Sequence, residues 1–236
     1  MKRPRYRMPA TVSHSVRTRL NSYALAASAA GVGALALAQP ADATIIYTKV
    51  HHVIRLGKSY GLDLNHDGTI DFVFKNVNAG TSNENRDLFS LVPAAGNGFL
   101  LGTRTNCKTC AALAIYGYPI NPYAGFSGKS VVLAHASALL GQNTFWGGRW
   151  ADVSNGYLGL RFKIGSETHY GWARLSVRES FHYDHGLVPL VTPTITGYAY
   201  ETVPDRGIFA GRTHGPGDVK PSALPATLGR LAVGRK

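Results

Sequence analysis

Nine consecutive residues, from Asp63 to Asp71, constrain the fold of this chain more than any other stretch. They read Asp-Leu-Asn-His-Asp-Gly-Thr-Ile-Asp, which places oxygen-bearing side chains at positions 1, 3, 5 and 9 of a tight loop. Position 6 is Gly68, the residue type that a sharp turn favours. Three carboxylates this close together repel one another unless a cation lies between them, and Ca²⁺ prefers such oxygen ligands. The pattern therefore predicts a calcium loop.

The residues on both sides of this loop predict strands. From Tyr60 to Leu64 and from Ile70 to Asn76, apolar residues alternate with other residues, as they do in a strand with one buried face. Position 12, where a helix-flanked calcium loop has a bidentate Glu, is Phe74. The segment is therefore expected to be strand–loop–strand.

The loop resembles the calcium hairpins of FG-GAP repeats, in which an Asp at position 9 completes the site. The resemblance implies that Ca²⁺ is bound by side-chain oxygens of Asp63, Asn65, Asp67 and Asp71 and by the backbone carbonyl of Thr69. The alternative is a plain hairpin turn, because Asp-Gly is itself a strong turn signal. Extracellular calcium modules have a Kd of about 10⁻⁴–10⁻³ M, so the ion would be structural.

Residues 1–43 read as an export signal. A start with six basic residues precedes an uncharged run rich in Ala, Leu and Gly, and Ala41-Asp42-Ala43 is a cleavage motif. We expect cleavage after Ala43, which leaves a secreted or cell-surface protein without a membrane span. The alternative is a retained anchor, although the run is short for a span of about 20 residues.

Cleavage removes six of 25 basic residues and one of 13 acidic residues, so 19 and 12 remain and the net charge falls from +12 to +7. The remaining excess is spread along the chain, which argues against nucleic acid as a partner. Acidic partners such as an extracellular polysaccharide or a cell-surface matrix fit the charge better.

The two cysteines, Cys107 and Cys110, form a single C-x-x-C motif. A zinc site needs a second such pair, and a thioredoxin-type redox motif needs a βαβ frame. In an oxidising compartment we expect a disulfide, with a redox role as the alternative.

Residues 44–212 predict one all-β domain, an antiparallel β-sandwich of the jelly-roll-like kind, and residues 213–236 predict a flexible tail. The clearest hairpin joins a strand at 157–164 to one at 170–177, and an exposed loop is expected at 178–186. Two interpretations are open for the aromatic residues of this region, which either pack at the edge of the sandwich or form a sugar-stacking surface. The residues concerned are Tyr170, Trp172, Tyr198 and Tyr200, with Arg161 and Arg174.

No catalytic constellation is evident in the sequence. The densest titratable cluster, Glu179, His182, Asp184 and His185, falls in the expected loop. No G-x-S-x-G elbow is present, and no two acidic residues are paired by spacing. The sequence favours a non-catalytic exported protein, with a carbohydrate-binding module as the alternative and a secreted hydrolase as the second alternative.

Two stretches resemble a block that recurs in exported bacterial proteins of the PEP-CTERM type. The first contains Leu-Arg-Phe and then His-Tyr-Gly-Trp-Ala-Arg-Leu-Ser-Val, and the second contains Tyr-Ala-Tyr-Glu-Thr-Val-Pro. Together they cover roughly Tyr157–Gly211. At residues 221–236 the chain has Pro-Ser-Ala-Leu-Pro and basic residues but lacks the Glu and the apolar span of the sorting signal. The resemblance implies an exported ectodomain and no particular reaction, whereas this departure from the sorting signal favours release over anchoring.

Overall fold

A computed structural model describes residues 44–81, 84–102, 109–139, 144–183 and 187–215 of this chain. All of them belong to one unit that spans Ala43–Lys236. The predicted signal segment and most of the predicted tail lie outside the described residues. Cys107 does too, so the predicted disulfide with Cys110 stays a prediction.

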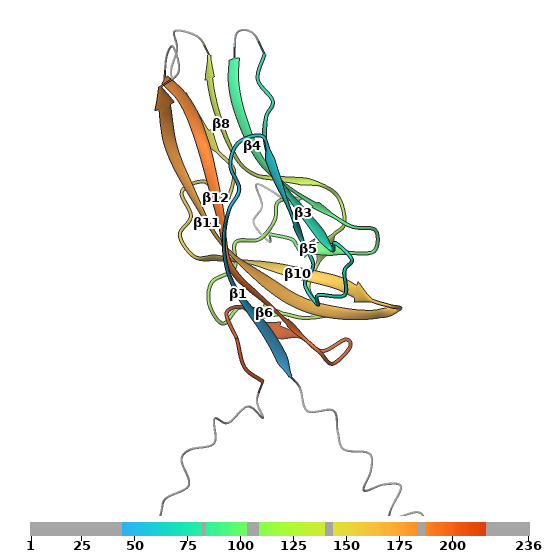
Figure 1. Cartoon of the computed structure of the whole chain (residues 1–236). Coiled ribbons are helices and arrows are strands. Elements are labelled where there is room, and N and C mark those ends of the chain that lie inside the picture. The colour runs from blue at the N-terminus through green and yellow to red at the C-terminus, as the bar shows by residue number, and fades with distance from the viewer. Residues whose placement is uncertain (1–43, 82–83, 103–108, 140–143, 184–186, 216–236) are drawn as a thin grey trace, which may run out of the picture. The chain divides into compact units, whose positions relative to one another are not determined.

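The described chain forms two large antiparallel sheets and a short ribbon (Figure 1). In hydrogen-bonded order, the six-stranded sheet comprises β1 (Ile45–Val53), β12 (Leu187–Glu201), β11 (Glu167–Tyr183), β10 (Gly156–Ile164), β5 (Gly98–Leu100) and β7 (Phe126–Ser127). The five-stranded sheet comprises β2 (Lys58–Leu62), β3 (Phe72–Asn78), β4 (Glu84–Pro93), β8 (Val131–Leu139) and β9 (Thr144–Gly147). The ribbon pairs β6 (Pro119–Ile120) with β13 (Ile208–Phe209).

The main core lies between the two large sheets. Phe72, Phe74 and Phe89 from one sheet and Leu160 and Leu175 from the other are fully buried in one cluster. Burial of each such side chain contributes roughly 1.5–3 kcal/mol, more than a typical single hydrogen bond, so the core dominates the stability of the fold. The predicted all-β, antiparallel β-sandwich is confirmed.

The β10–β11 hairpin follows the alternation that the sequence predicts. Leu158, Leu160 and Phe162 are buried, whereas Lys163 is exposed. The turn is tighter than expected, because Ile164 already pairs with Glu167 and Gly165 adopts a φ of +60°.

The expected loop at 178–186 is wrong for most of its length. β11 continues to Tyr183 and pairs with β12 from Leu187 onward, so these residues extend a long hairpin.

The sequence predicts two strands, at 187–191 and 194–202, and the structure joins them in the single strand β12. This strand contains Pro189 and Pro193, although proline lacks the N–H that a central strand needs. The Pro193 carbonyl points away from β11, because it accepts the Ile54 N–H at 2.9 Å. The nitrogen of a strand residue points to the same side as its carbonyl, so the Pro193 nitrogen also points away from β11. Pro189 lies four residues before Pro193 and has the same orientation, because orientation in a strand repeats every two residues. Neither proline therefore removes a hydrogen bond between β11 and β12.

Two buried polar side chains of the five-stranded sheet reach this edge of β12 just beyond the end of β1. Asn76 Nδ2 donates to the carbonyls of Ile54 (3.0 Å) and Val191 (2.8 Å). Asp87 Oδ2 accepts the Val191 N–H at 2.7 Å. Asn76 and Asp87 thus replace the strand neighbour that β12 lacks there and join the two sheets.

The β6–β13 ribbon covers the outer face of the six-stranded sheet. Ile120 and Ile208 of the ribbon pack with Tyr170, Trp172 and Ala199 of that sheet in a second buried cluster. At this end the sheet is therefore buried on both faces.

Candidate functional site

The predicted calcium loop connects β2 to β3. Leu62 and Phe72 form the last strand pair before the loop, and the Asp71 N–H donates to the Leu62 carbonyl at 2.9 Å. The predicted strand–loop–strand arrangement is therefore confirmed, with each strand displaced by two residues from its expected bounds. The loop begins and ends on a regular ladder, which fixes the separation of its two ends.

The turn depends on the backbone conformation of two residues. Gly68 has a φ of +90°, and a Cβ placed there would meet no atom within 4 Å, so its conformation rather than lack of space requires glycine. His66 also has a positive φ, of 61°. The sequence signal for Gly68 is therefore correctly explained by the turn.

The loop carboxylates accept hydrogen bonds from the backbone of their own turn. Asp63 accepts the N–H groups of Asp67 (3.2 Å) and Gly68 (2.8 Å) with different oxygens. Asp67 Oδ1 accepts the Thr69 N–H at 2.7 Å, and its Oδ2 accepts Asn65 Nδ2 at 2.9 Å. The predicted ligand residues are thus gathered in one compact turn.

Asp71 closes the loop from inside the protein. It is 4% exposed, and its two oxygens accept the Leu64 N–H at 2.9 Å and Asn97 Nδ2 at 3.1 Å. Burial raises the pKa of the Asp71 carboxyl, and the negative charges of Asp63 and Asp67 add to the increase, against these two hydrogen bonds. Without a cation, the ionised form of Asp71 is therefore disfavoured by its surroundings.

The side chains are not drawn together into a complete metal-ligand group. Among the described residues, no three His, Cys, Asp or Glu side chains are arranged to hold a metal ion. A carboxylate has about four lone-pair sites, so an oxygen that accepts one N–H retains a site for a cation. The residues present fit a hard cation, and calcium binding stays a prediction.

The tip of the loop contacts the opposite sheet through a residue that the sequence did not single out. His66 Nε2 lies 3.0 Å from Thr48 Oγ1 on β1 and 3.4 Å from the Tyr198 hydroxyl on β12. Leu64, inside the loop, is fully buried in the main core. The loop therefore spans both layers of the sandwich, and no local sequence pattern reveals this.

The predicted sugar-stacking surface is wrong. Tyr170, Trp172 and Tyr198 are 4%, 1% and 5% exposed. Tyr198 also lies on the opposite face of the six-stranded sheet from Tyr170 and Trp172. Paired residues share a face, and Tyr198 pairs with Ala173 whereas Trp172 pairs with Ala199. The packing interpretation is the correct one, since the ribbon covers one face and the main core covers the other.

The two arginines of that predicted surface are held by neighbouring groups. Arg174 is half-buried, and its Nε donates to Thr196 Oγ1 at 2.8 Å. The Arg161 guanidinium lies 5.2 Å from the centroid of the Phe126 ring. Arg174 is therefore bound to Thr196 of the neighbouring strand β12, and Arg161 packs on Phe126 of β7.

The titratable cluster at 178–186 is only partly described. Glu179 and His182 lie on β11, three residues apart, and so point to opposite faces of the strand. Asp184 and His185 lie outside the described residues. Burial raises the pKa of Glu179, and the negative charge of Asp152 adds to the increase. Among the described residues, no further acid–base partner is evident for Glu179 and Asp152.

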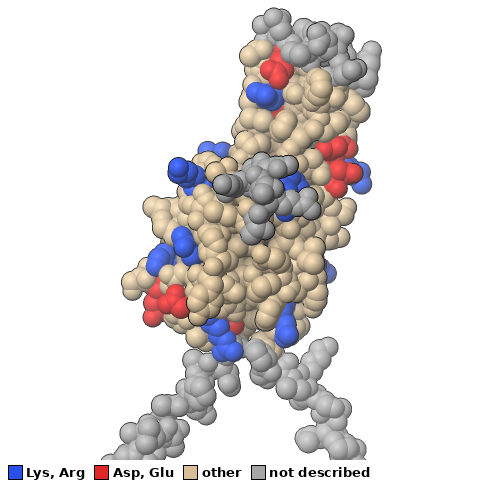
Figure 2. Space-filling model, turned by 180° about the vertical axis from the view of Figure 1, so that it is seen from behind, with Lys and Arg blue, Asp and Glu red and all other residues tan. Residues whose placement is uncertain are grey.

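The basic residues show no concentration on the face drawn in Figure 2. Their side chains are scattered among uncharged ones there, as the spread of charge along the sequence predicts.

Among the described residues, no helix is sufficiently long and apolar to span a membrane. Comparison with protein-family models, curated proteins and solved structures found no match to this chain.

Proposed function

We propose that this chain is an exported, non-catalytic β-sandwich protein that binds Ca²⁺ in its Asp63–Asp71 hairpin and acts at the cell surface or in the extracellular matrix. The observation that carries the proposal is the compact turn in which the carboxylates of Asp63, Asp67 and Asp71 accept backbone N–H groups of residues 64–69. Residues 1–43 support export, and the resemblance to PEP-CTERM ectodomains supports the extracellular setting.

Calcium suits this hairpin because the site offers only oxygen donors. Ca²⁺ accepts six to eight oxygen ligands in flexible geometry, from carboxylates, amides and backbone carbonyls. Asp63, Asn65, Asp67 and Asp71 supply the side-chain oxygens, and Thr69 supplies its carbonyl. A bound cation offsets the mutual repulsion of the three carboxylates, including the charge that burial disfavours on Asp71.

The role of the ion is structural in this proposal. His66 and Leu64 attach the loop to the opposite sheet and to the core. An ion that fixes the loop therefore also fixes the contact between β2–β3 and the six-stranded sheet. With a Kd of about 10⁻⁴–10⁻³ M, the site would be filled at extracellular calcium concentrations and would not act as a cytosolic sensor.

Terbium luminescence tests the proposed site directly. The Tyr198 hydroxyl lies 3.4 Å from Nε2 of the loop residue His66, so a tyrosine ring lies beside the loop. Tb³⁺ bound in place of Ca²⁺ is therefore expected to emit on excitation of tyrosine, and added Ca²⁺ should displace it. Asp67→Ala should abolish this emission.

Asp205→Asn is the matched control for that variant. It removes one exposed carboxylate far along the chain from the loop, at a residue whose positive φ of 54° Asn tolerates. The control should retain the calcium-displaceable emission. Emission that survives Asp67→Ala, or that is absent from the unmodified protein, would refute calcium binding by the hairpin.

A further inference from the structure

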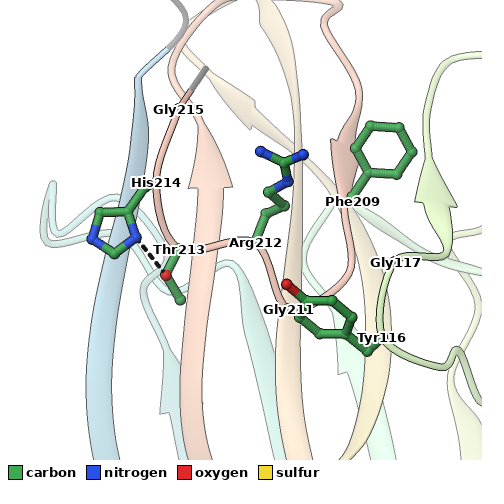
Figure 3. Close-up of a pocket in the computed structure, with 8 residues that line it drawn as sticks. All are labelled: Tyr116, Gly117, Phe209, Gly211, Arg212, Thr213, His214 and Gly215. Atoms are coloured by element: carbon green, nitrogen blue, oxygen red, sulfur yellow. Dashed lines mark hydrogen bonds between the residues drawn. The ribbon is translucent and has the colours of Figure 1, made fainter. Parts of the chain in front are cut away.

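A cleft of about 620 Å³ lies beside the β6–β13 ribbon, remote in sequence from the calcium hairpin (Figure 3). Its walls come from two segments, the turn before β6 and the chain from the end of β13 onward. The residues that line it include Tyr116, Gly117, Phe209, Gly211, Arg212 and His214.

The backbone of the cleft is fixed by hydrogen bonds on both sides. The Gly117 N–H donates to the Ala210 carbonyl, and the Ala210 N–H donates to the Tyr118 carbonyl, both at 2.9 Å. Trp172 Nε1, from the buried cluster below, donates to the Arg212 carbonyl at 3.1 Å. The two walls are thus held at a constant separation.

Two aromatic rings of the cleft are exposed although their positions are fixed. Tyr116 is 69% exposed and Phe209 is 49% exposed. A Cβ on Gly211 would come within 2.4 Å of Tyr116 Cδ2, so this glycine lets the ring lie against the backbone. Tyr157 also lies beside Gly211 and meets Tyr116 edge-on, with ring centroids 6.4 Å apart. An exposed ring held in this way is pre-organised to receive a flat apolar ligand surface.

The cleft also contains an unpaired cation. Arg212 is exposed, and its guanidinium carbon lies 6.0 Å from the centroid of the Phe209 ring. Within the described part of the chain, no carboxylate lies within ion-pair distance of Arg212. Figure 3 shows Tyr116, Arg212 and Phe209 on one side of the chain, whereas His214 lies on the other side, bound to Thr213.

We propose that this cleft binds an anionic carbohydrate, with a sugar ring on Tyr116 and a uronate carboxylate on Arg212. A pyranose has an apolar C–H face that suits an aromatic ring and a hydroxyl edge that suits exposed backbone groups. Arg binds a planar carboxylate through two parallel hydrogen bonds, which a neutral sugar does not offer. The site shares no residue with the calcium hairpin.

Calorimetric titration with a short oligogalacturonate tests the proposal, with the methyl ester of the same oligomer as the uncharged ligand. The unmodified protein should bind the acid, and Arg212→Gln and Tyr116→Ala should each weaken that binding about tenfold or more. The methyl ester should bind the unmodified protein about as weakly as the acid binds Arg212→Gln. Both substituted side chains are exposed, so the variants should keep the native circular dichroism.

Two control variants match these changes. Lys75→Gln removes one exposed positive charge from β3, and Tyr123→Ala removes a tyrosine that is 96% exposed outside the cleft. Both should bind the acid like the unmodified protein. Absence of saturable binding, equal binding of the acid and its ester, or equal losses in the control variants would overturn the proposal. It would also fail if Asp67→Ala abolished binding while Arg212→Gln did not, because the uronate would then be held through calcium.

Discussion

At the scale of single residues, Asp87 has a strongly perturbed environment. It is 2% exposed, and only its Oδ2 has a hydrogen-bond partner, the Val191 N–H. Its Oδ1 and the Oδ1 of Asn76 are buried without a partner among the described residues. Burial raises the pKa of Asp87 from its usual 3.8 to about 6, against the hydrogen bond from Val191. The folded protein therefore favours the protonated carboxyl, which carries no charge and has a proton to donate.

This environment predicts how stability depends on pH. Between about pH 4 and pH 6 the folded protein binds a proton at Asp87 that the unfolded chain has released, so stability falls as the pH rises. The shift of about two pH units corresponds to roughly 3 kcal/mol. Asp87→Asn, which is neutral at every pH, should lose this part of the pH dependence and should be more stable than the unmodified protein above pH 6.

Urea unfolding at pH 4.5 and pH 7.5 measures this difference. Asp205→Asn serves as the control and should keep the pH dependence of the unmodified protein. If Asp87→Asn shows the same change in unfolding free energy between the two pH values as the unmodified protein, the assignment to Asp87 is wrong.

The polar residues of the calcium hairpin can be recognised in the sequence, whereas the buried polar residues that join the two sheets cannot. The Asp63–Asp71 pattern is predictable because all of its members lie within nine residues and share one turn. Asn76 and Asp87 are not predictable in this way, because they bind Val191 across 115 and 104 residues. No spacing rule connects residues that meet only after two sheets have packed.

At the scale of strands, the predictions succeeded where apolar residues alternate and failed where a polar residue occupies a core position. No strand is predicted from the sequence at residues 84–93, where β4 lies, because Asp87 takes a buried position in its alternation, ahead of Phe89 and Leu91. The sequence predicts two strands, at 187–191 and 194–202, where the structure has the single β12. The N–H groups that Pro189 and Pro193 lack are tolerated on the side away from β11. In both cases the neighbouring chain tolerates a residue that local sequence rules count against a strand.

The same contacts predict the effect of Asn76→Ala. The substitution leaves the carbonyls of Ile54 and Val191 buried without their donor, at about 1–3 kcal/mol each. We expect the free energy of unfolding to fall by roughly 2–5 kcal/mol, as measured by urea denaturation. Asn78→Ala, two residues further along β3, removes only an exposed contact with the Gly80 N–H and should cost less than about 1 kcal/mol. Equal losses in the two variants would show that Asn76 does not join the sheets.

At the scale of the whole molecule, the sequence predicts the sandwich but not which faces are covered. Alternation in the sequence divides residues 170–177 between two faces of a strand. Only the pairing of β11 with β12 shows that Tyr198 and Tyr200 lie on the same face as Ala173 and Gly171. The ribbon that buries Tyr170 and Trp172 consists of two-residue strands, which are too short to produce a periodic pattern. Tyr116 and Phe209, two of the aromatic residues that remain exposed, lie in this ribbon region, where the sequence predicts no binding surface.

The account depends most on a cation held between β2 and β3 in a loop that contacts the other sheet. Thermal unfolding of the protein in about 10 mM calcium, compared with chelator, tests this claim most directly. A ligand that binds only the folded state at a Kd of about 10⁻⁴–10⁻³ M should add about 1.4–2.7 kcal/mol, seen as a rise of several degrees in Tm. Asp67→Ala should show no such rise. Equal melting temperatures of the unmodified protein in calcium and in chelator would contradict the account.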